Sequence, residues 1–405
     1  MTAGQRRRGR AVSGPLAGIR VLDLSRLVAG NQLTMLLGDF GADVIKVEQP
    51  GHGDTLRNWV VQGSEVYWKV YGRNKRSIAL DLKNEQAREL LLRLAGESDV
   101  LVESFRPGNL ERLGLSPETL HERNPKLVVV RISGWGQTGS MSQEPGFGTL
   151  IEAMSGLAAM NGFPDREPVL PPGALADMVA GTYGAFSVLA AVRHAEAGGP
   201  GQVIDLSLFE PLFSVLGPQA GTYRLTGDAP QRSGSRSSSS APRNVYATAD
   251  GQWLALSGST QMMTERIFRT IGRPELVDDL RFRDNTARLA HVLELDAILG
   301  DYFGAHNLDE TLSAMRTAGV TAAPVMDIGD LMESEYFKTR GVVIDGPGPE
   351  GMGSVPMHDV VPRLNGTPGS VAAAAPGLGQ HSREILQELL PHERWEELQK
   401  QGVFG

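Results

Sequence analysis

Residues 18–48 constrain the fold of this chain most, because they hold a strand, a helix and a second strand in close succession. The runs of Ile, Val and Leu predict buried strands at 18–25 and 42–48, with a helix at 32–40 between them. Two strands joined through a helix run parallel, so this unit predicts an α/β fold with a parallel sheet. A Rossmann dinucleotide site would need the GxGxxG fingerprint at the first turn. Only Gly30 stands there, so we expect a Rossmann-like layout without the dinucleotide signal.

The composition limits the class of protein. The chain has 405 residues, 41% hydrophobic and 21% charged, which is typical of a globular protein with two domains. No apolar run suggests a membrane span, and the net charge of −8 argues against general nucleic-acid binding. We therefore expect neither a membrane nor a nucleic acid as a partner. The absence of cysteine excludes disulfides, thiolate metal sites and a cysteine nucleophile, and it is compatible with the cytoplasm, the location that we predict. The histidines show no metal-ligand spacing, so no metal site is expected.

The local amino-acid composition changes along the chain, and these changes set the expected domain boundaries. Residues 1–14 carry several arginines without a following apolar stretch, which predicts a flexible basic tail rather than a secretory signal. A large Rossmann-like domain is expected from 15–222 together with 320–405. The intervening residues 223–319 begin with a Ser- and Gly-rich linker and continue with an Asp-Gly hairpin signal and helices. This segment predicts a smaller α+β domain.

One carboxylate, Asp177, stands in the otherwise uncharged segment 174–192. A bare buried charge is costly, so Asp177 must cap a helix, find a partner or face a cavity. It could be the N-cap of the helix predicted at 177–196, or a nucleophile or base in a dry pocket. The chain has no GxSxG elbow and no Walker loop. This favours a carboxylate that reacts covalently with a ligand bringing its own reactive group.

Cations cluster near the predicted sheet edge. Arg73, Lys75 and Arg76 precede the strand predicted at 77–82, and Arg106 follows the end of another predicted strand. Ligands of open parallel sheets collect at the carboxyl ends of the strands. Solvated charges are one explanation of this cluster, and phosphate binding is the other.

Aromatic residues follow a turn-rich loop at 49–54. Trp59, Tyr67 and Trp68 lie close behind it, either as part of a binding site or as part of the core.

Several motifs recur in order along the chain and together cover most of it. They are PLAGIRVLDLS at 15–25 followed by Ala29-Gly30, LLGDFGADVIKVE at 36–48, Gly53-Asp54, NKRSI at 74–78, ESFRPG at 103–108 and GWGQTG at 134–139. In these motifs the chain resembles the family III CoA transferases, the CaiB/BaiF family. The resemblance implies an interlocked homodimer in which each ring-like chain threads the other. It also implies an acyl-CoA and a free carboxylic acid as substrates, with no permanently bound cofactor.

The resemblance also implies roles for single residues in catalysis and CoA binding. Asp177 matches the family's nucleophile, which forms an aspartyl anhydride and then an aspartyl-CoA thioester. The residues expected to bind CoA are Lys75, Arg76, Arg106, Val28, Ala29 and Arg73.

Other residues are expected to bind the substrate, and these are Tyr67, Phe147, Trp59 and Gly258. The segment 257–259 matches a glycine-rich loop of formyl-CoA transferase but is shorter. Val28 and Phe147 replace a glutamine and a tyrosine of that enzyme, which argues against oxalate and formate as substrates. We expect a dicarboxylate acceptor and succinyl-CoA as donor, with Arg232, Arg236 and Arg243 either pairing the distal carboxylate or facing solvent.

Two alternatives from the sequence remain. The racemase branch of the family pairs its aspartate with a histidine, and the matching stretch at 145–148 has none. Proton transfer on both faces of a carbon normally needs two groups, so a 2-methylacyl-CoA racemase ranks below a transferase. A non-catalytic CoA-binding protein is the second alternative, and Asp177 in its apolar frame argues against it.

Overall fold

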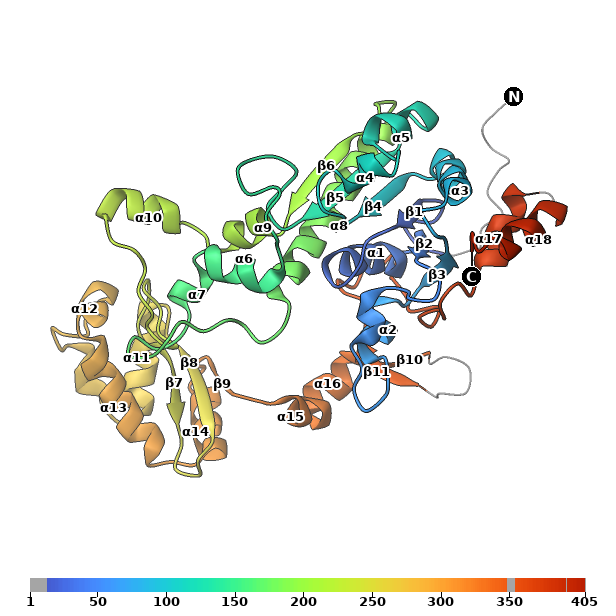
Figure 1. Cartoon of the computed structure of the whole chain (residues 1–405). Coiled ribbons are helices and arrows are strands. Elements are labelled where there is room, and N and C mark those ends of the chain that lie inside the picture. The colour runs from blue at the N-terminus through green and yellow to red at the C-terminus, as the bar shows by residue number, and fades with distance from the viewer. Residues whose placement is uncertain (1–12, 348–353, 391, 405) are drawn as a thin grey trace. The chain divides into compact units, whose positions relative to one another are not determined.

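The computed structural model describes residues 13–347, 354–390 and 392–404. The chain divides into two units (Figure 1). Unit 1 comprises residues 1–157, 170–218 and 341–405, and unit 2 comprises 158–169 and 219–340. Most of the basic tail predicted at 1–14 lies outside the described residues.

Six parallel strands form the sheet of unit 1 within the described residues, in the order β3-β2-β1-β4-β5-β6. Their bounds are β1 Arg20–Asp23, β2 Asp43–Glu48, β3 Lys75–Ala79, β4 Val100–Glu103, β5 Val128–Ser133 and β6 Val203–Ser207. In the register, Leu22 of β1 pairs with Ile45 of β2 on one side and Leu101 of β4 on the other. The predicted parallel α/β sheet is thus confirmed. The strand order reverses between β1 and β4, where open sheets of this type form their ligand crevice.

Helices cover both faces of this sheet, and an antiparallel hairpin belongs to the same unit. The helical segments are α1 Ala29–Asp39, η1 Thr55–Asn58, α2 Val66–Tyr71, α3 Glu85–Gly96, α4 Asn109–Arg112, α5 Pro117–Arg123, α6 Gly148–Met154, α8 Leu175–Glu196, α9 Phe209–Val215, α17 Ser382–Leu386, η3 Gln387–Leu389 and α18 His392–Lys400. The hairpin strands are β10 Val343–Gly346 and β11 Val355–His358.

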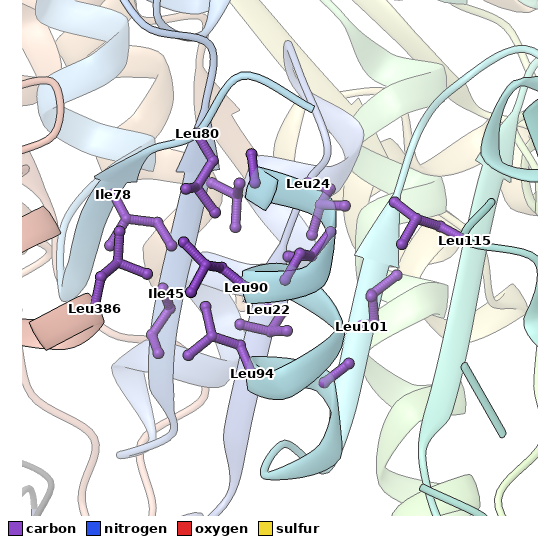
Figure 2. Close-up of a cluster of buried hydrophobic side chains, with 14 of the residues drawn as sticks. Leu22, Leu24, Ile45, Ile78, Leu80, Leu90, Leu94, Leu101, Leu115 and Leu386 are labelled. Atoms are coloured by element: carbon purple, nitrogen blue, oxygen red, sulfur yellow. The ribbon is translucent and has the colours of Figure 1, made fainter. Parts of the chain in front are cut away.

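Alternation along the strands divides the core of unit 1 into two clusters. Leu22 lies in one cluster with Leu90 and Leu94 of α3, as Figure 2 shows. Its neighbour Val21 lies in the other cluster, with residues of α1 and α8 such as Leu33. This two-residue period is what a strand buried on both faces requires. Each face of the sheet therefore has its own apolar layer.

Small residues let α8 approach α1 closely. A Cβ added to Gly181 of α8 would lie 2.7 Å from the carbonyl oxygen of Ala29, and one on Gly184 would lie 2.4 Å from Leu33. Among the described helices, α8 alone is long and apolar enough to cross a membrane by length and composition, which the sequence analysis did not expect. One face of α8 is packed into the core of unit 1, and a core helix passes the same test of length and composition.

The sheet of unit 2 has the order β7-β8-β9 and is antiparallel. Its strands are β7 Arg243–Ala247, β8 Trp253–Ser257 and β9 Ala322–Pro324. The predicted Asp-Gly hairpin is confirmed, since β7 and β8 pair and Gly251 has a φ of +75°. The predicted return to the large domain at 320 differs from the structure, because β9 pairs with β8 and keeps the chain in unit 2 up to residue 340.

Short helices make up the rest of this part of the chain. They are α7 Leu157–Met160, α10 Gln219–Thr226, α11 Gln261–Thr270, η2 Pro274–Val277, α12 Asn285–Ala290, α13 Val292–Gly304, α14 Leu308–Thr317, α15 Ile328–Glu333 and α16 Glu335–Arg340.

Candidate active site

Asp177 lies in the first turn of α8 and does not cap that helix. The N-cap residue is Ala174, whose side chain makes no capping hydrogen bond, and the helix begins at Leu175. The backbone amide of Ala176 instead donates to Oε1 of Glu152, a buried residue of α6, at 3.1 Å. The N-cap interpretation of Asp177 is therefore wrong, because Glu152 already satisfies an amide of the first turn.

Three helices meet at the Asp177 carboxylate. Ala29, the first residue of α1, packs against α8, where an added Cβ on Gly181 would lie 2.7 Å from its carbonyl oxygen, and its backbone amide favours the ionised form of Asp177 as a hydrogen-bond donor. Gly148, the first residue of α6, faces it so closely that an added Cβ would lie 2.3 Å from Oδ2. Glycine at that position leaves room for the carboxylate. The amide end of α1 is the favourable end of the helix dipole for a negative charge.

The surroundings of Asp177 raise its pKa from 3.8 to about 6. Burial is the largest cause, and the negative charge of Glu152 acts in the same direction. The hydrogen bond from Ala29 opposes them by stabilising the ionised form. Asp177 is thus mostly ionised at neutral pH and more basic than an ordinary aspartate, as a carboxylate nucleophile requires.

Two of the predicted substrate-binding residues lie on or next to α2. The rings of Trp59 and Tyr67 meet edge to face with centroids 5.2 Å apart, and they are 40% and 43% exposed. Tyr71, at the end of α2, donates to the sulfur of Met178 at 3.6 Å. Met178 and Tyr71 both pack against a small buried cluster that contains Val28. The structure therefore brings α2 and Val28 together beside the helix that carries Asp177.

Predicted site residues also lie in unit 2. Gly258 is packed there against Ile267 and Pro242, where an added Cβ would lie 2.8 and 2.9 Å from them. The guanidinium of Arg236 forms an ion pair with Asp296 at 2.5 Å. These contacts hold both residues within unit 2, where Arg236 also lines a cavity of about 880 Å³ together with Arg243 and Ser257.

Two adjoining cavities open at the carboxyl ends of the unit 1 strands. The first, which we name the crevice cavity, has a volume of about 340 Å³ and includes Lys83 and Arg112 in its lining. The second, the turn cavity, has a volume of about 260 Å³ and includes Arg106 and Phe147. Both are lined by Arg26, Phe105 and Asn109.

The shared lining makes the two cavities neighbours around the β1–α1 turn. Leu27 of that turn, Gly146 and Phe147 line the turn cavity, and Gly148, which follows directly, contacts Asp177. The turn cavity therefore reaches the residue that directly precedes Gly148, although Asp177 itself is not part of its lining.

The cations that line these cavities have free charges. Arg26, Lys83, Arg106 and Arg112 are exposed and form no ion pair with any described residue. Unpaired cations at a sheet edge are available for a ligand with several phosphates.

The other predicted cations already have carboxylate partners. Arg73 is paired with Asp39 at 2.6 Å and Arg76 with Asp43 at 2.7 Å. Lys75 is fully buried and contacts the carboxylate at the end of β1 at 3.1 Å. These contacts favour a structural role for all three, rather than the predicted contact with CoA phosphates.

Sequence reasoning missed several residues of this site. Arg26 directly follows the first strand, so the argument that selected Arg106 would have found it as well. No local signal distinguished Lys83, Arg112 or Glu152, because their positions depend on how separate helices pack.

The match to a family model decides the family, since CoA-transferase family III matches residues 16–382. The chain belongs to CoA-transferase family III. It is 38% identical over 379 residues to the succinyl-CoA–D-citramalate CoA-transferase of Chloroflexus aurantiacus, covering 93% of this chain and 94% of that protein. It is also 38% identical to the beta subunit of the succinyl-CoA–L-malate CoA-transferase of the same organism, covering 94% and 96% of the two chains.

The fold of this CoA transferase is also found in a solved structure of a related protein. A CaiB/BaiF family protein from Brucella suis superposes with a TM-score of 0.81 at 34% identity, covering 93% of this chain and all of that one. The relatives of the present chain are named CoA transferases. The chain is therefore an enzyme whose substrates include a CoA thioester. Among the described residues, no group of three or more His, Cys, Asp or Glu side chains could hold a metal ion.

Proposed function

We propose that this enzyme moves CoA from succinyl-CoA to a free dicarboxylic acid, with Asp177 as the covalent nucleophile. The observation that carries the proposal is the half-buried Asp177 carboxylate at the amide end of α1, next to a cavity lined by unpaired cations. The relatives named for citramalate and malate support a dicarboxylate as acceptor.

The negative phosphates of the CoA nucleotide match the positive side chains that line the crevice cavity. Its phosphates would be held by Arg26, Lys83 and Arg112, which have no carboxylate partner among the described residues. The pantetheine arm would then pass along the turn cavity, by Leu27 and Phe147, and bring the thioester to Asp177. This arrangement uses the crevice at the strand-order reversal, as open α/β sheets do.

The first half of the proposed reaction loads the enzyme. Asp177 attacks the carbonyl carbon of succinyl-CoA, the C–S bond breaks, and a mixed succinyl-aspartyl anhydride forms with release of the CoA thiolate. The thiolate then attacks the aspartyl carbonyl carbon of the anhydride. Succinate leaves, and Asp177 carries CoA as a thioester.

The second half runs the same steps with the acceptor acid. Its carboxylate attacks the aspartyl thioester, releasing the thiolate and forming a new anhydride. The thiolate attacks the acceptor carbonyl, which restores the Asp177 carboxylate and gives the new acyl-CoA. Each attack places negative charge on an oxygen bound to the Asp177 carbon or to its acyl partner, and the backbone amide of Ala29 would stabilise that charge. Water must be excluded, because it would hydrolyse the anhydride.

A panel of CoA donors and acids tests the proposed function. The purified enzyme would be mixed with succinyl-CoA and, in turn, citramalate, malate, glutarate, acetate and formate, and the acyl-CoA products would be weighed by mass spectrometry. We expect exchange with the dicarboxylates and none with Asp177→Ala. Turnover that persists in Asp177→Ala, or exchange restricted to monocarboxylates, would refute the proposal.

We also propose that the enzyme is a homodimer, interlocked as the family resemblance implies. An apolar face is left uncovered on unit 1. Its members on α8 include Tyr183, Phe186 and Leu189, of which Phe186 is 71% exposed. Exposed apolar area of this kind is typical of an obligate interface. Light scattering is expected to give twice the mass of the chain, and a stable monomer would contradict the proposal.

A further inference from the structure

The turn between β1 and α1 holds Leu27 in a conformation that a leucine rarely adopts. Its φ is +62°, in the left-handed region where a side chain strains the backbone. Two residues later, Ala29 begins α1 and packs against Gly181 of α8, and its backbone amide lowers the pKa of Asp177 on that helix. The geometry of this turn therefore sets where the Ala29 amide lies relative to Asp177. Something must hold the turn in place against the strain.

Asp54, from the loop after β2, holds the N–H of that strained residue directly and its carbonyl through Asn31. Its Oδ1 accepts the Leu27 backbone N–H at 3.0 Å. Its Oδ2 accepts from Nδ2 of Asn31 at 2.7 Å, and the same Nδ2 donates to the Leu27 carbonyl at 2.6 Å. Both backbone polar groups of Leu27 are thus fixed by one carboxylate and one amide. All of these atoms are buried or half-buried.

Buried charges around Asp54 keep it ionised and in place. Nζ of Lys46 lies 2.8 Å from Oδ2, and the Asp54 backbone N–H donates to Glu48 at 2.8 Å. Burial opposes ionisation of Asp54, but Lys46 and the amide donors hold its pKa below the ordinary value. Lys46 also contacts Asp23, which in turn binds the fully buried Lys75.

We propose that Asp54 is a positioning residue for the transfer reaction: by holding Leu27 in the left-handed conformation, it aims the Ala29 N–H at the Asp177 carboxylate. Asp54 itself need not contact any substrate, because it acts through two residues of the turn. This inference rests on the proposed role of Asp177, and it assigns a function to a loop far from α8 in the sequence.

The test combines activity with a direct titration of Asp177. Aspartate labelled with ¹³C at the carboxyl carbon is incorporated, and the Asp177 signal is identified by its loss in Asp177→Asn. Among the described residues, Glu152 of α6 is the charged group that acts on the Asp177 carboxylate, and Tyr71 of α2 contacts the adjacent Met178; neither has a hydrogen bond or ion pair with Asp54. A shift of the Asp177 titration after a change at Asp54 must therefore pass through the turn.

In Asp54→Asn we expect the pKa of Asp177 to rise by at least about half a pH unit, because the ionised form loses part of a hydrogen bond. We expect kcat to fall at least about tenfold while KM for succinyl-CoA changes less than about threefold. Asn31→Ala, in the first turn of α1, should produce the same two changes to a smaller degree. This variant replaces Asp54→Asn in the test if Asp54→Asn does not fold.

Asp39→Asn is the matched control. Asp39 is another buried aspartate of unit 1, paired with Arg73 at the far end of α1. It should lower stability as Asp54→Asn does, but leave the titration of Asp177 unchanged.

Two outcomes would overturn the inference: an unchanged Asp177 titration in folded Asp54→Asn or Asn31→Ala, or an equal shift in Asp39→Asn. If the wild-type enzyme transfers no CoA, the proposed function is wrong. The pH titration of Asp177 would still decide whether Asp54 positions the turn.

Discussion

Removing the charge of Asp177 should stabilise the fold while it destroys activity. Burial and the charge of Glu152 raise the pKa of Asp177 from 3.8 to about 6 in the folded protein. The folded state therefore disfavours the ionised carboxylate, and the cost is absent at low pH and complete above pH 6. The gap between the two pKa values corresponds to about 3 kcal/mol at pH 8. At pH 5 the folded Asp177 is mostly protonated, and the cost falls to about half.

The perturbation is Asp177→Asn, which keeps the shape of the side chain and an oxygen that can accept the Ala29 N–H. Denaturant unfolding of both proteins at pH 8 and pH 5 measures the effect. We expect the variant to be more stable by up to about 3 kcal/mol at pH 8 and by about half as much at pH 5. A variant that is equally or less stable at pH 8, or a difference that does not depend on pH, would refute the argument that Asp177 is held ionised at a cost.

Three further predictions follow from the same site. Since only the ionised Asp177 attacks a thioester, kcat/KM should fall about tenfold per pH unit below about pH 6, the pKa of Asp177, and a profile that stays flat to pH 4.5 would contradict this. Gly148→Ala would place a Cβ 2.3 Å from the Asp177 carboxylate, so we expect kcat to fall at least about a hundredfold with the far-UV spectrum unchanged, and normal turnover would show that the carboxylate has room to move. Arg112→Ala should raise KM for succinyl-CoA by about three- to tenfold, whereas Arg76→Ala should lower stability without that change, and the reverse result would restore the sequence-based assignment.

The sheet of unit 1 could be predicted from the sequence because its signals are local. The strands predicted at 18–25 and 42–48 contain β1 and β2, since continuous apolar runs mark strands that are buried on both faces. The strand β9, in contrast, could not be assigned to unit 2 from the sequence. Its pairing with β8 joins residues far apart in the sequence, so the boundary of unit 2 lay beyond local signals.

The site shows the same division between local and long-range information. Asp177 could be singled out because a lone charge in an apolar run is visible in the sequence. The start of α8 could not be predicted, because the backbone amide of Ala176 in its first turn is bound by Glu152 of another helix. The run of cations before β3 could not be sorted either. Whether Lys75 binds a phosphate or a buried aspartate depends on which carboxylate the fold places beside it.

The covalent role of Asp177 is the central claim, and chemical trapping tests it most directly. The enzyme would be incubated with succinyl-CoA alone and then treated with borohydride, which reduces an aspartyl thioester to the alcohol, or with hydroxylamine, which converts it to the hydroxamate. Peptide mass spectrometry then locates the modified residue. We expect modification of Asp177 only after succinyl-CoA is added, and none in protein without acyl-CoA. Modification at another residue, or none at Asp177 in protein that is turning over, would contradict it.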